Sequence, residues 1–354
     1  MKKMLSVILV VMMAIGMMVG TAAADEIKIG MSFGTLQQEH WVKSRDIMQA
    51  VCDEQGVTFV VQSANDDMQK QISQCENLIT QGIDVLILQA LDTEAAAPII
   101  QTAHEAGVPV IGFVRPVQNC DVDAFFGSNY KDCGIDQAEY ALTVAPKGKY
   151  ALIEGAPDDV NARVIHEGHM EVLQPHIDSG DIEIVYEQWC DNWSADDALR
   201  YIEDCMTSNN NDVQFIICAN DAFAGAAVTV LAEQDLVGKI MMTGNDCDLT
   251  ACQRIVEGIQ GQTEYPCFPR IADACINAAI EMAKTGDISA YTNGATLNNG
   301  YKDVPFGAGE HLYSVTAENM DLVYTTGWHS VEDIYANIPE TEWPEAAKEF
   351  KAAQ

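Results

Sequence analysis

The chain is poor in positive charge. Its 354 residues include 19 Lys and Arg against 53 Asp and Glu, which gives a formal net charge of −34. So acidic a protein repels phosphate backbones and anionic lipid head groups, so the sequence argues against binding to nucleic acid and against charge-driven binding to membranes. The acidity identifies no ligand, because a need for solubility explains it equally well.

The motifs of several enzyme classes are also missing. The chain has neither G-x-x-x-x-G-K-[ST] nor G-x-G-x-x-G, so nucleotide binding has no support. Its 11 cysteines contain no C-x-x-C and no Cys/His cluster with zinc spacing. Their odd number, and the apolar surroundings of residues such as Cys218 and Cys275, predict mostly free, buried thiols.

Two short patterns resemble catalytic or metal sites but have simpler explanations. His166 and His169 are spaced i, i+3 rather than i, i+4, and the sequence shows no third ligand, so we expect no metal there. The adjacent acids Asp158 and Asp159 could act as an acid–base pair, but such acids at a helix start are more typical of caps. A sugar-processing enzyme therefore remains only the weakest alternative, and we expect no catalytic residue and no cofactor.

The amino terminus carries the one long hydrophobic run, from Leu5 to about Gly20. Two lysines precede the run and Ala22-Ala23-Ala24 follows it, which predicts a signal peptide over residues 1–24 rather than a membrane anchor. No cysteine stands at the cleavage point, so we expect no lipid anchor. The mature protein is expected in the periplasm or outside the cell.

From residue 26 onward, apolar strands and amphipathic helices alternate, which is typical of parallel, doubly wound α/β sheets. Two successive blocks of this pattern predict two such lobes. The expected strands are 26–33, 58–64, 85–91, 109–114 and 124–128 in the first block, and 149–155, 182–189, 213–220, 239–246 and 261–266 in the second. The region after Pro305 shows few clear elements: a strand-like stretch at 322–330, assigned to the second lobe, and a short helix near 344–353.

Polar side chains gather directly after these strands, at the edge where open α/β sheets bind ligands. The clusters are 37–41, 65–67, Arg115-Pro116, 158–161, 189–193, Asn220-Asp221 and Asn245-Asp246. For Asn220-Asp221 the simpler alternative is a strand end with Asp221 as a helix cap, and Asp67 and Asp158 could also be caps. If the two sheets face each other, all the clusters line one cleft.

The clusters contain the side chains that a neutral, polyhydroxylated ligand requires. Carboxylates accept hydrogen bonds from hydroxyls, Arg donates a planar fork, and Asn both donates and accepts. Trp offers a flat face to the C–H face of a sugar ring, although any single Trp is more often ordinary core filling. The position of Trp41, Trp189 and Trp193 beside polar strand ends favours the binding function.

The chain resembles the periplasmic sugar-binding proteins of ABC transporters, type I fold, and within them most of all the xylose-binding proteins. The resemblance covers roughly residues 26–330. It rests on VVQSAND (60–66), QWCDNW (188–193), the ANDA–AGAA pattern at 219–227, TGNDCDL (243–249) and TLNNGYKDVP (296–305).

The resemblance implies two lobes that close on one sugar over a three-strand hinge. Crossings are expected near Ser128-Asn129, Glu264-Tyr265 and 298–303, with Trp41 and Trp193 on either side of the sugar ring. The implied division is 25–128 plus 266–300 for the amino-terminal lobe, 129–265 plus 301–335 for the carboxy-terminal lobe, and 336–354 for a tail.

Four polar positions of the xylose-binding pattern are altered here. His40 and His166 stand where that pattern has Arg, Val114 where it has Asp, and Pro266 where it has Lys. Such changes alter selectivity, because a site built for one hydroxyl rejects a ligand without it. The complete candidate ligand-binding set is His40, Trp41, Arg115, Asp159, Asn161, His166, Trp193, Asn220 and Asp246.

We therefore predict a monomeric solute-binding protein that captures xylose or a related monosaccharide and delivers it to an ABC permease. The alternative is a sensor that presents the bound sugar to a chemoreceptor or histidine kinase. The sequence does not separate the two, because both partners read the closed form.

Overall fold

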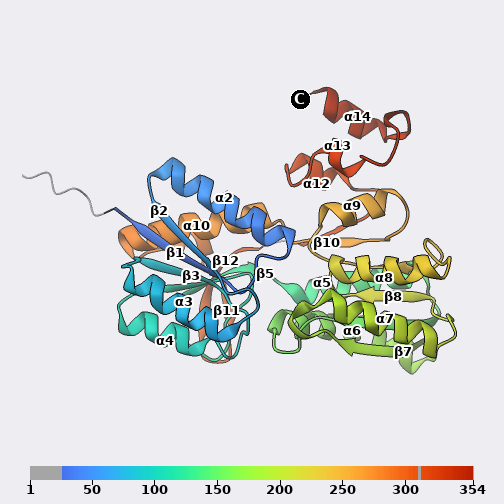
Figure 1. Ribbon diagram of the computed structural model, residues 1–354, viewed down its shortest axis with the longest axis horizontal. Coiled ribbons are helices and arrows are strands. Elements are labelled where there is room, and N and C mark those ends of the chain that lie inside the picture. The colour runs from blue at the N-terminus through green and yellow to red at the C-terminus, as the bar shows by residue number, and fades with distance from the viewer. Residues whose placement is uncertain (1–25, 310–311, 354) are drawn as a thin grey trace, which may run out of the picture.

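A computed structural model describes residues 26–309 and 312–353, and the expected signal peptide lies outside these residues. Two α/β lobes lie side by side, and a carboxy-terminal segment lies over the second lobe next to α9 (Leu249–Val256) (Figure 1). This confirms the predicted fold class of two lobes with parallel sheets.

The first lobe is built on a seven-stranded sheet with the order β11-β12-β5-β4-β3-β1-β2. All neighbouring strands are parallel except β11 and β12, which pair antiparallel. The strands are β1 (Lys28–Phe33), β2 (Thr58–Ser63), β3 (Val85–Gln89), β4 (Val110–Phe113), β5 (Ala124–Ser128), β11 (Thr296–Asn298) and β12 (Asp303–Gly309). The helices are α2 (Glu39–Gln55), α3 (Met68–Thr80), α4 (Ala97–Glu105), α10 (Phe268–Thr285) and α11 (Ser289–Thr292).

This sheet is buried on both faces, which explains its unbroken Val/Ile/Leu strands. Side chains alternate along a strand, so Val85 and Ile87 join the core under α2 and α10, whereas Leu86 and Leu88 join the core under α3 and α4. Figure 1 shows the two helix layers on opposite sides of the sheet.

The second lobe has a four-stranded parallel sheet with the order β7-β6-β8-β9. Its elements are α5 (Tyr130–Val144), β6 (Gly148–Glu154), α6 (Val160–Asp178), β7 (Ile182–Trp189), the 3-10 turn η1 (Asp191–Trp193), α7 (Ala195–Ser208), β8 (Phe215–Cys218), α8 (Asp221–Glu233) and β9 (Met241–Met242). Helices α5 and α6 cover one face, and α7 and α8 cover the other. The eleven cysteines are all unpaired, as predicted, and ten of them are buried.

The chain crosses between the lobes after Ser128, as predicted, and a second time around β10 (Thr263–Tyr265), which pairs antiparallel with β13 (Tyr313–Val315). The predicted third crossing at 298–303 is wrong. These residues form a hairpin in which Asn298 pairs with Asp303, and β12 continues beside β5 in the first sheet. The start of the stretch 301–335 therefore belongs to the first lobe, and the third crossing falls between β12 and β13.

The carboxy-terminal segment is helical. The stretch 322–330, expected to be strand-like, instead contains α12 (Asp321–Thr325), followed by α13 (Val331–Ile334), the turn η2 (Glu340–Glu342) and α14 (Glu345–Ala352). The segment buries Trp328 and Tyr335 in the same hydrophobic cluster as Cys252 of α9. Within the described part of the chain, no helix has both the length and the apolar character needed to cross a bilayer.

Candidate functional site

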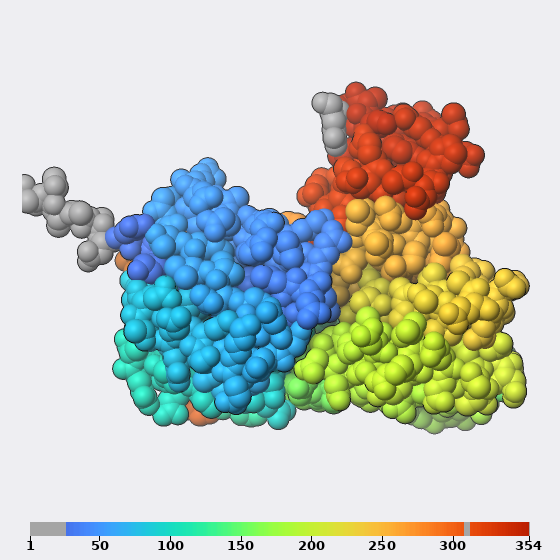
Figure 2. Space-filling view, in the orientation of Figure 1, coloured from blue at the N-terminus to red at the C-terminus, as the bar shows by residue number. Residues whose placement is uncertain are grey.

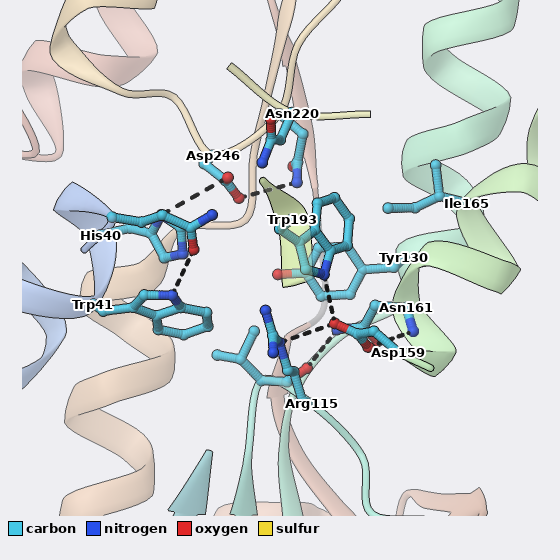
Figure 3. A pocket seen from close by; sticks show the side chains of 13 residues that line it. His40, Trp41, Arg115, Tyr130, Asp159, Asn161, Ile165, Trp193, Asn220 and Asp246 are labelled. Carbon is cyan, nitrogen blue, oxygen red and sulfur yellow. Dashed lines mark hydrogen bonds and ion pairs between the residues drawn. The ribbon is translucent and has the colours of Figure 1, made fainter. Parts of the chain in front are cut away.

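A cavity lies between the two lobes, at the carboxyl ends of their parallel strands (Figure 3). Its lining residues come from both lobes: Gln38, His40, Trp41, Val114, Arg115 and Tyr130, then Asp159, Asn161, Ile165, Trp193, Asn220, Asn245 and Asp246. Figure 3 shows two indole rings, one from each lobe, with Arg115 and Asp159 below them and Asp246 and Asn220 above.

The first lobe holds Trp41 in place by packing. The indole is 3% exposed and meets Phe33, Phe113 and Phe268 with ring centroids 6.1 to 6.3 Å away. Its Nε1–H donates to Gln38 Oε1 at 2.7 Å. One position earlier on α2, His40 stacks on Phe268 at 4.5 Å. The wall on this side is thus an extension of the hydrophobic core.

Arg115 links the lobes through a buried ion pair. Its Nε lies 2.9 Å from Asp159 Oδ2, and the two side chains are 7% and 1% exposed. Its guanidinium also donates to the backbone oxygen of Leu91 at 3.3 Å and lies 5.8 Å from the centre of the Trp41 ring. Breaking such a buried pair is costly, since the remaining charge then lacks a partner.

Val114, the residue before Arg115, has an unusual backbone. Its φ is +61°, in the left-handed region that a β-branched residue rarely adopts. In this conformation its carbonyl accepts a hydrogen bond from Asn161 Nδ2, at 2.9 Å, across the gap between the lobes. Strain of this kind is found where the surroundings fix a functional geometry.

In the second lobe, a short turn rather than a core positions Trp193. The turn η1 has φ of +53° at Asn192 and +55° at Trp193. The indole stacks on Phe223 at 6.0 Å, and its Nε1–H donates to Asp159 Oδ2 at 3.1 Å. Gly155 backs the ring so closely that a Cβ there would come within 2.3 Å of the indole.

Two of the predicted binding residues also cap helices. Asp159 caps α6 by accepting from Asn161 N–H, and Asn220 caps α8 by accepting from Phe223 N–H, both at 2.9 Å. The cap occupies Asn220 Oδ1, which leaves its Nδ2–H₂ as the donor available to a ligand. The alternative of Asp221 as the cap is wrong, because this buried carboxylate accepts instead from Thr263 and Gln260.

Asp246 is the second carboxylate of the cavity. Burial raises its pKa well above the usual range, as do the nearby charges of Asp248 and Asp221, while Arg115 acts in the opposite direction. Among the side chains that the structure describes, only Asn245 is within hydrogen-bond distance of this carboxyl, and it donates from Nδ2 at 3.0 Å. The carboxyl therefore keeps capacity for hydrogen bonds with a ligand hydroxyl.

His40 faces Asp246 across the cavity at the long end of the ion-pair range, beyond hydrogen-bond distance (Figure 3). The His40 Nδ1 to Asp246 Oδ2 distance is 3.8 Å, and the Nδ1 atom is buried without a hydrogen-bond partner. Burial, together with the charge of Arg115, lowers the pKa of His40 to about 3. A neutral imidazole thus stands at this corner, where the xylose-binding pattern has a guanidinium.

The lobes are in contact around the cavity, and Figure 2 shows them meeting along a continuous seam. Besides Arg115–Asp159 and Asn161–Val114, the interlobe contacts include Thr93 Oγ1 to the Asp158 carbonyl at 3.1 Å, Arg163 to Glu94 at 2.9 Å and the Leu249 N–H to Glu39 at 3.1 Å. The structure is therefore a closed form.

Eight of the nine predicted site residues line this cavity, and His166 does not. Asn161 and Ile165 face it because they are four residues apart on α6, whereas His166 lies about 100° further around the helix. Its Nδ1 instead approaches Glu154 Oε1 at 3.1 Å. The set also lacked Gln38, Val114 and Asn245, and it missed Tyr130 and Ile165, which carry no signal of a strand-end cluster.

Two lobes that meet over a buried cavity at their strand ends define a two-lobed ligand-binding protein. The sequence profile of the periplasmic binding protein domain matches residues 29–287, and the chain belongs to this family.

Proteins similar in sequence or structure match almost the whole chain. It is 37% identical over 334 residues to the D-xylose-binding periplasmic protein of Haemophilus influenzae, covering 94% of this chain and 99% of that protein. It is 35% identical to the protein of that name from Escherichia coli, covering 88% and 94%. A carbohydrate transporter solute-binding protein from Chloroflexus aurantiacus, solved with D-glucose, has a TM-score of 0.79 at 25% identity, covering 87% of this chain and 98% of that one. These relatives are binding proteins, so the chain is a binding protein and not an enzyme.

Proposed function

We propose that this protein captures one monosaccharide, xylose or a related sugar, in the cavity between its lobes. The observation that carries the proposal is the composition of the cavity, in which two indoles from opposite lobes accompany a guanidinium, two carboxylates and four amides. Indole faces match the apolar faces of a sugar ring, and the polar groups match its hydroxyls. The relatives named for D-xylose support the same class of ligand.

Some polar groups of the cavity already bond to one another, so fewer of their atoms are free to bond to a ligand. Asp159 accepts hydrogen bonds from the Asn161 N–H, Arg115 and Trp193. Asp246 has fewer partners, so it is the carboxylate that would receive a sugar hydroxyl. The neutral His40 and the apolar Val114 replace two charged groups of the xylose-binding pattern, which favours a sugar with a less polar edge on that side.

Closure is the functional event of the proposal. A sugar that contacts both lobes binds the closed form more tightly than the open one, and it shifts the population by that difference in affinity. Arg115 and Asp159 belong to different lobes, so their ion pair forms only on closure.

A thermal-shift screen over pentoses, hexoses, deoxysugars and polyols tests the substrate class. A specific ligand should raise the melting temperature progressively with its concentration. At a ligand concentration of 100 times Kd, the free energy of unfolding should be about 2.7 kcal/mol higher than without ligand. Calorimetry on each sugar that shifts the protein then gives the order of affinities. If no sugar acts and an amino acid or peptide does, the proposed substrate class is wrong.

We further propose that a monomer acts in the periplasm or outside the cell and hands the sugar to an ABC permease. The named relatives are periplasmic, which supports the location. Delivery to a chemoreceptor or histidine kinase is the alternative. Sugar-dependent stimulation of the ATPase of a reconstituted permease supports transport, whereas sugar-dependent binding to a receptor domain supports sensing.

A further inference from the structure

The second lobe holds a cluster of metal-ligating side chains that does not line the cavity. Glu154 ends β6, and His166 and His169 lie one turn apart on α6, so both imidazoles face the strand. Their Nδ1 atoms lie 3.1 and 2.9 Å from Glu154 Oε1, and the three ligand atoms are all within 4.8 Å of one another. The histidine pair lacked a third ligand in the sequence, and β6 supplies it.

The hydrogen bonds of Gln137 fix the proton on His169. The Gln137 Nε2 group donates to the backbone carbonyls of Cys218 and Gly244, at 3.2 and 2.9 Å. Its Oε1 must then be the atom that accepts from His169 Nε2, at 2.8 Å. A neutral imidazole carries one N–H, so the Nδ1 of a neutral His169 presents a lone pair toward Glu154.

A lone pair that faces a carboxylate oxygen at 2.9 Å is repulsive unless a cation lies between them. In addition, Glu154 Oε2 is fully buried and has no hydrogen-bond partner. A proton on His169 Nδ1 would remove the repulsion with Glu154 Oε1 but would leave Glu154 Oε2 without a partner. A metal ion bound to the carboxylate and the imidazole would satisfy both oxygens.

We propose that Glu154, His166 and His169 form a binding site for a divalent transition-metal ion, with Zn²⁺ as the best match. Two imidazoles and a carboxylate are a ligand set that Zn²⁺ takes, and tetrahedral ligands at roughly 2.0–2.1 Å lie about 3.3 Å apart, close to the separations found here. Gln137 Oε1 accepts from the other ring nitrogen of His169, which is the contact that holds a ligating imidazole in place.

The fourth position is open toward solvent. Glu187 Oε1, on the neighbouring strand β7, lies 3.9 Å from His166 Nδ1 and is in place to complete the set, as is water. The side chains of His166 and Glu187 are 24% and 37% exposed, which gives an ion a route to the buried ligands. Since Gly155, next to Glu154, backs Trp193, the ion would stiffen one wall of the binding cavity.

The test is a Zn²⁺ titration of the purified protein after chelator treatment, followed by calorimetry, with excess Mg²⁺ to occupy surface carboxylates. We expect one site per chain. Glu154→Gln and His166→Gln should each weaken it at least ten-fold, whereas His176→Gln, on the same helix but outside the cluster, should leave it unchanged. Co²⁺ should give the visible absorption of tetrahedral coordination, and His166→Gln should remove it.

Absence of zinc binding by the unaltered protein would overturn the proposal, as would equal affinity in His166→Gln, which would assign the ion to surface acids. His166 is partly exposed, so this variant keeps the test decisive even if Glu154→Gln fails to fold. The zinc site does not depend on the proposed sugar, whose affinity is measured separately.

Discussion

The two lobes build their halves of the cavity in different ways. The first lobe presents Trp41 and His40 from a long helix, locked by Phe33, Phe113 and Phe268, so its wall is a continuation of the core. The second lobe presents its groups from strand ends, caps and a 3-10 turn, and holds them by hydrogen bonds. Packing gives the first wall rigidity, whereas directional bonds give the second its specificity for hydroxyl positions.

The contact that joins the two halves should show the largest effect. Arg115→Met leaves Asp159 buried without its cation, and breaking one partner of such a pair costs about 3–5 kcal/mol. Sugar affinity, measured by calorimetry, should therefore fall at least about 100-fold.

Arg163→Met is the matched control, because Arg163 also pairs across the lobes, with Glu94, but at side-chain exposures of 35% and 59%. Its loss should change affinity by no more than about 1 kcal/mol. Equal losses in both variants would mean that the buried pair has no special part in closure.

Replacing each tryptophan in turn shows whether the first wall is held by packing and the second by hydrogen bonds. Trp41→Ala should lower the free energy of unfolding by about 3–5 kcal/mol, as for a large buried aromatic. Trp193→Ala should cost at most about 2 kcal/mol, since its ring is less buried and stands on a turn. Both variants should lose sugar binding. Urea unfolding and calorimetry separate the two effects, and equal destabilisation would remove the contrast between the walls.

Asp246→Asn should improve stability and impair function. The variant removes a carboxyl whose pKa is raised by burial, so the sugar-free protein should gain about 1–3 kcal/mol in urea unfolding at pH 8. Sugar affinity should fall at least ten-fold. Asp248→Asn is the control: burial raises the pKa of Asp248 to about 8, but this residue does not line the cavity. It should raise stability without weakening binding.

The stability that His40 contributes should depend on pH in the opposite direction to that of Asp246, because the pKa of His40 is lowered by burial and that of Asp246 is raised. His40 has a folded pKa of about 3, below the unfolded value near 6.5, so the unfolded chain takes up a proton first as the pH falls. Stability from this residue is complete above pH 6.5 and is lost between about pH 6.5 and 3, approaching about 1.4 kcal/mol per pH unit.

Denaturant unfolding of His40→Gln from pH 8 to pH 4.5 checks this dependence. The variant should lack this component of acid sensitivity, with no change of slope above pH 7. Parallel curves for both proteins below pH 6 would show that His40 takes up a proton while folded.

Much of the site followed from local patterns in the sequence. The alternation of strands and helices predicted both sheets, and the rule that ligands bind at the carboxyl ends of parallel strands predicted where the polar groups gather. Trp41, Arg115 and Asn220 were identified in this way, with the family resemblance adding their roles. The errors fell where local signals are weak: β9 is two residues long, and the stretch 322–330 starts in helix α12 and continues as a turn, although it is rich in residues that favour strands.

The sequence by itself thus determined the elements, the two lobes and the chemistry of the cavity, because these depend on periodicity and residue type. Tertiary structure decided that β12 joins the first sheet, since strand pairing depends on residues far apart in the sequence, such as Phe306 and Phe125, which are 181 positions apart. It also decided that Ile165 rather than His166 faces the cavity and that His40 is uncharged. Finally, it brought Glu154 to the histidine pair, because a contact between strand and helix has no signature in either segment alone.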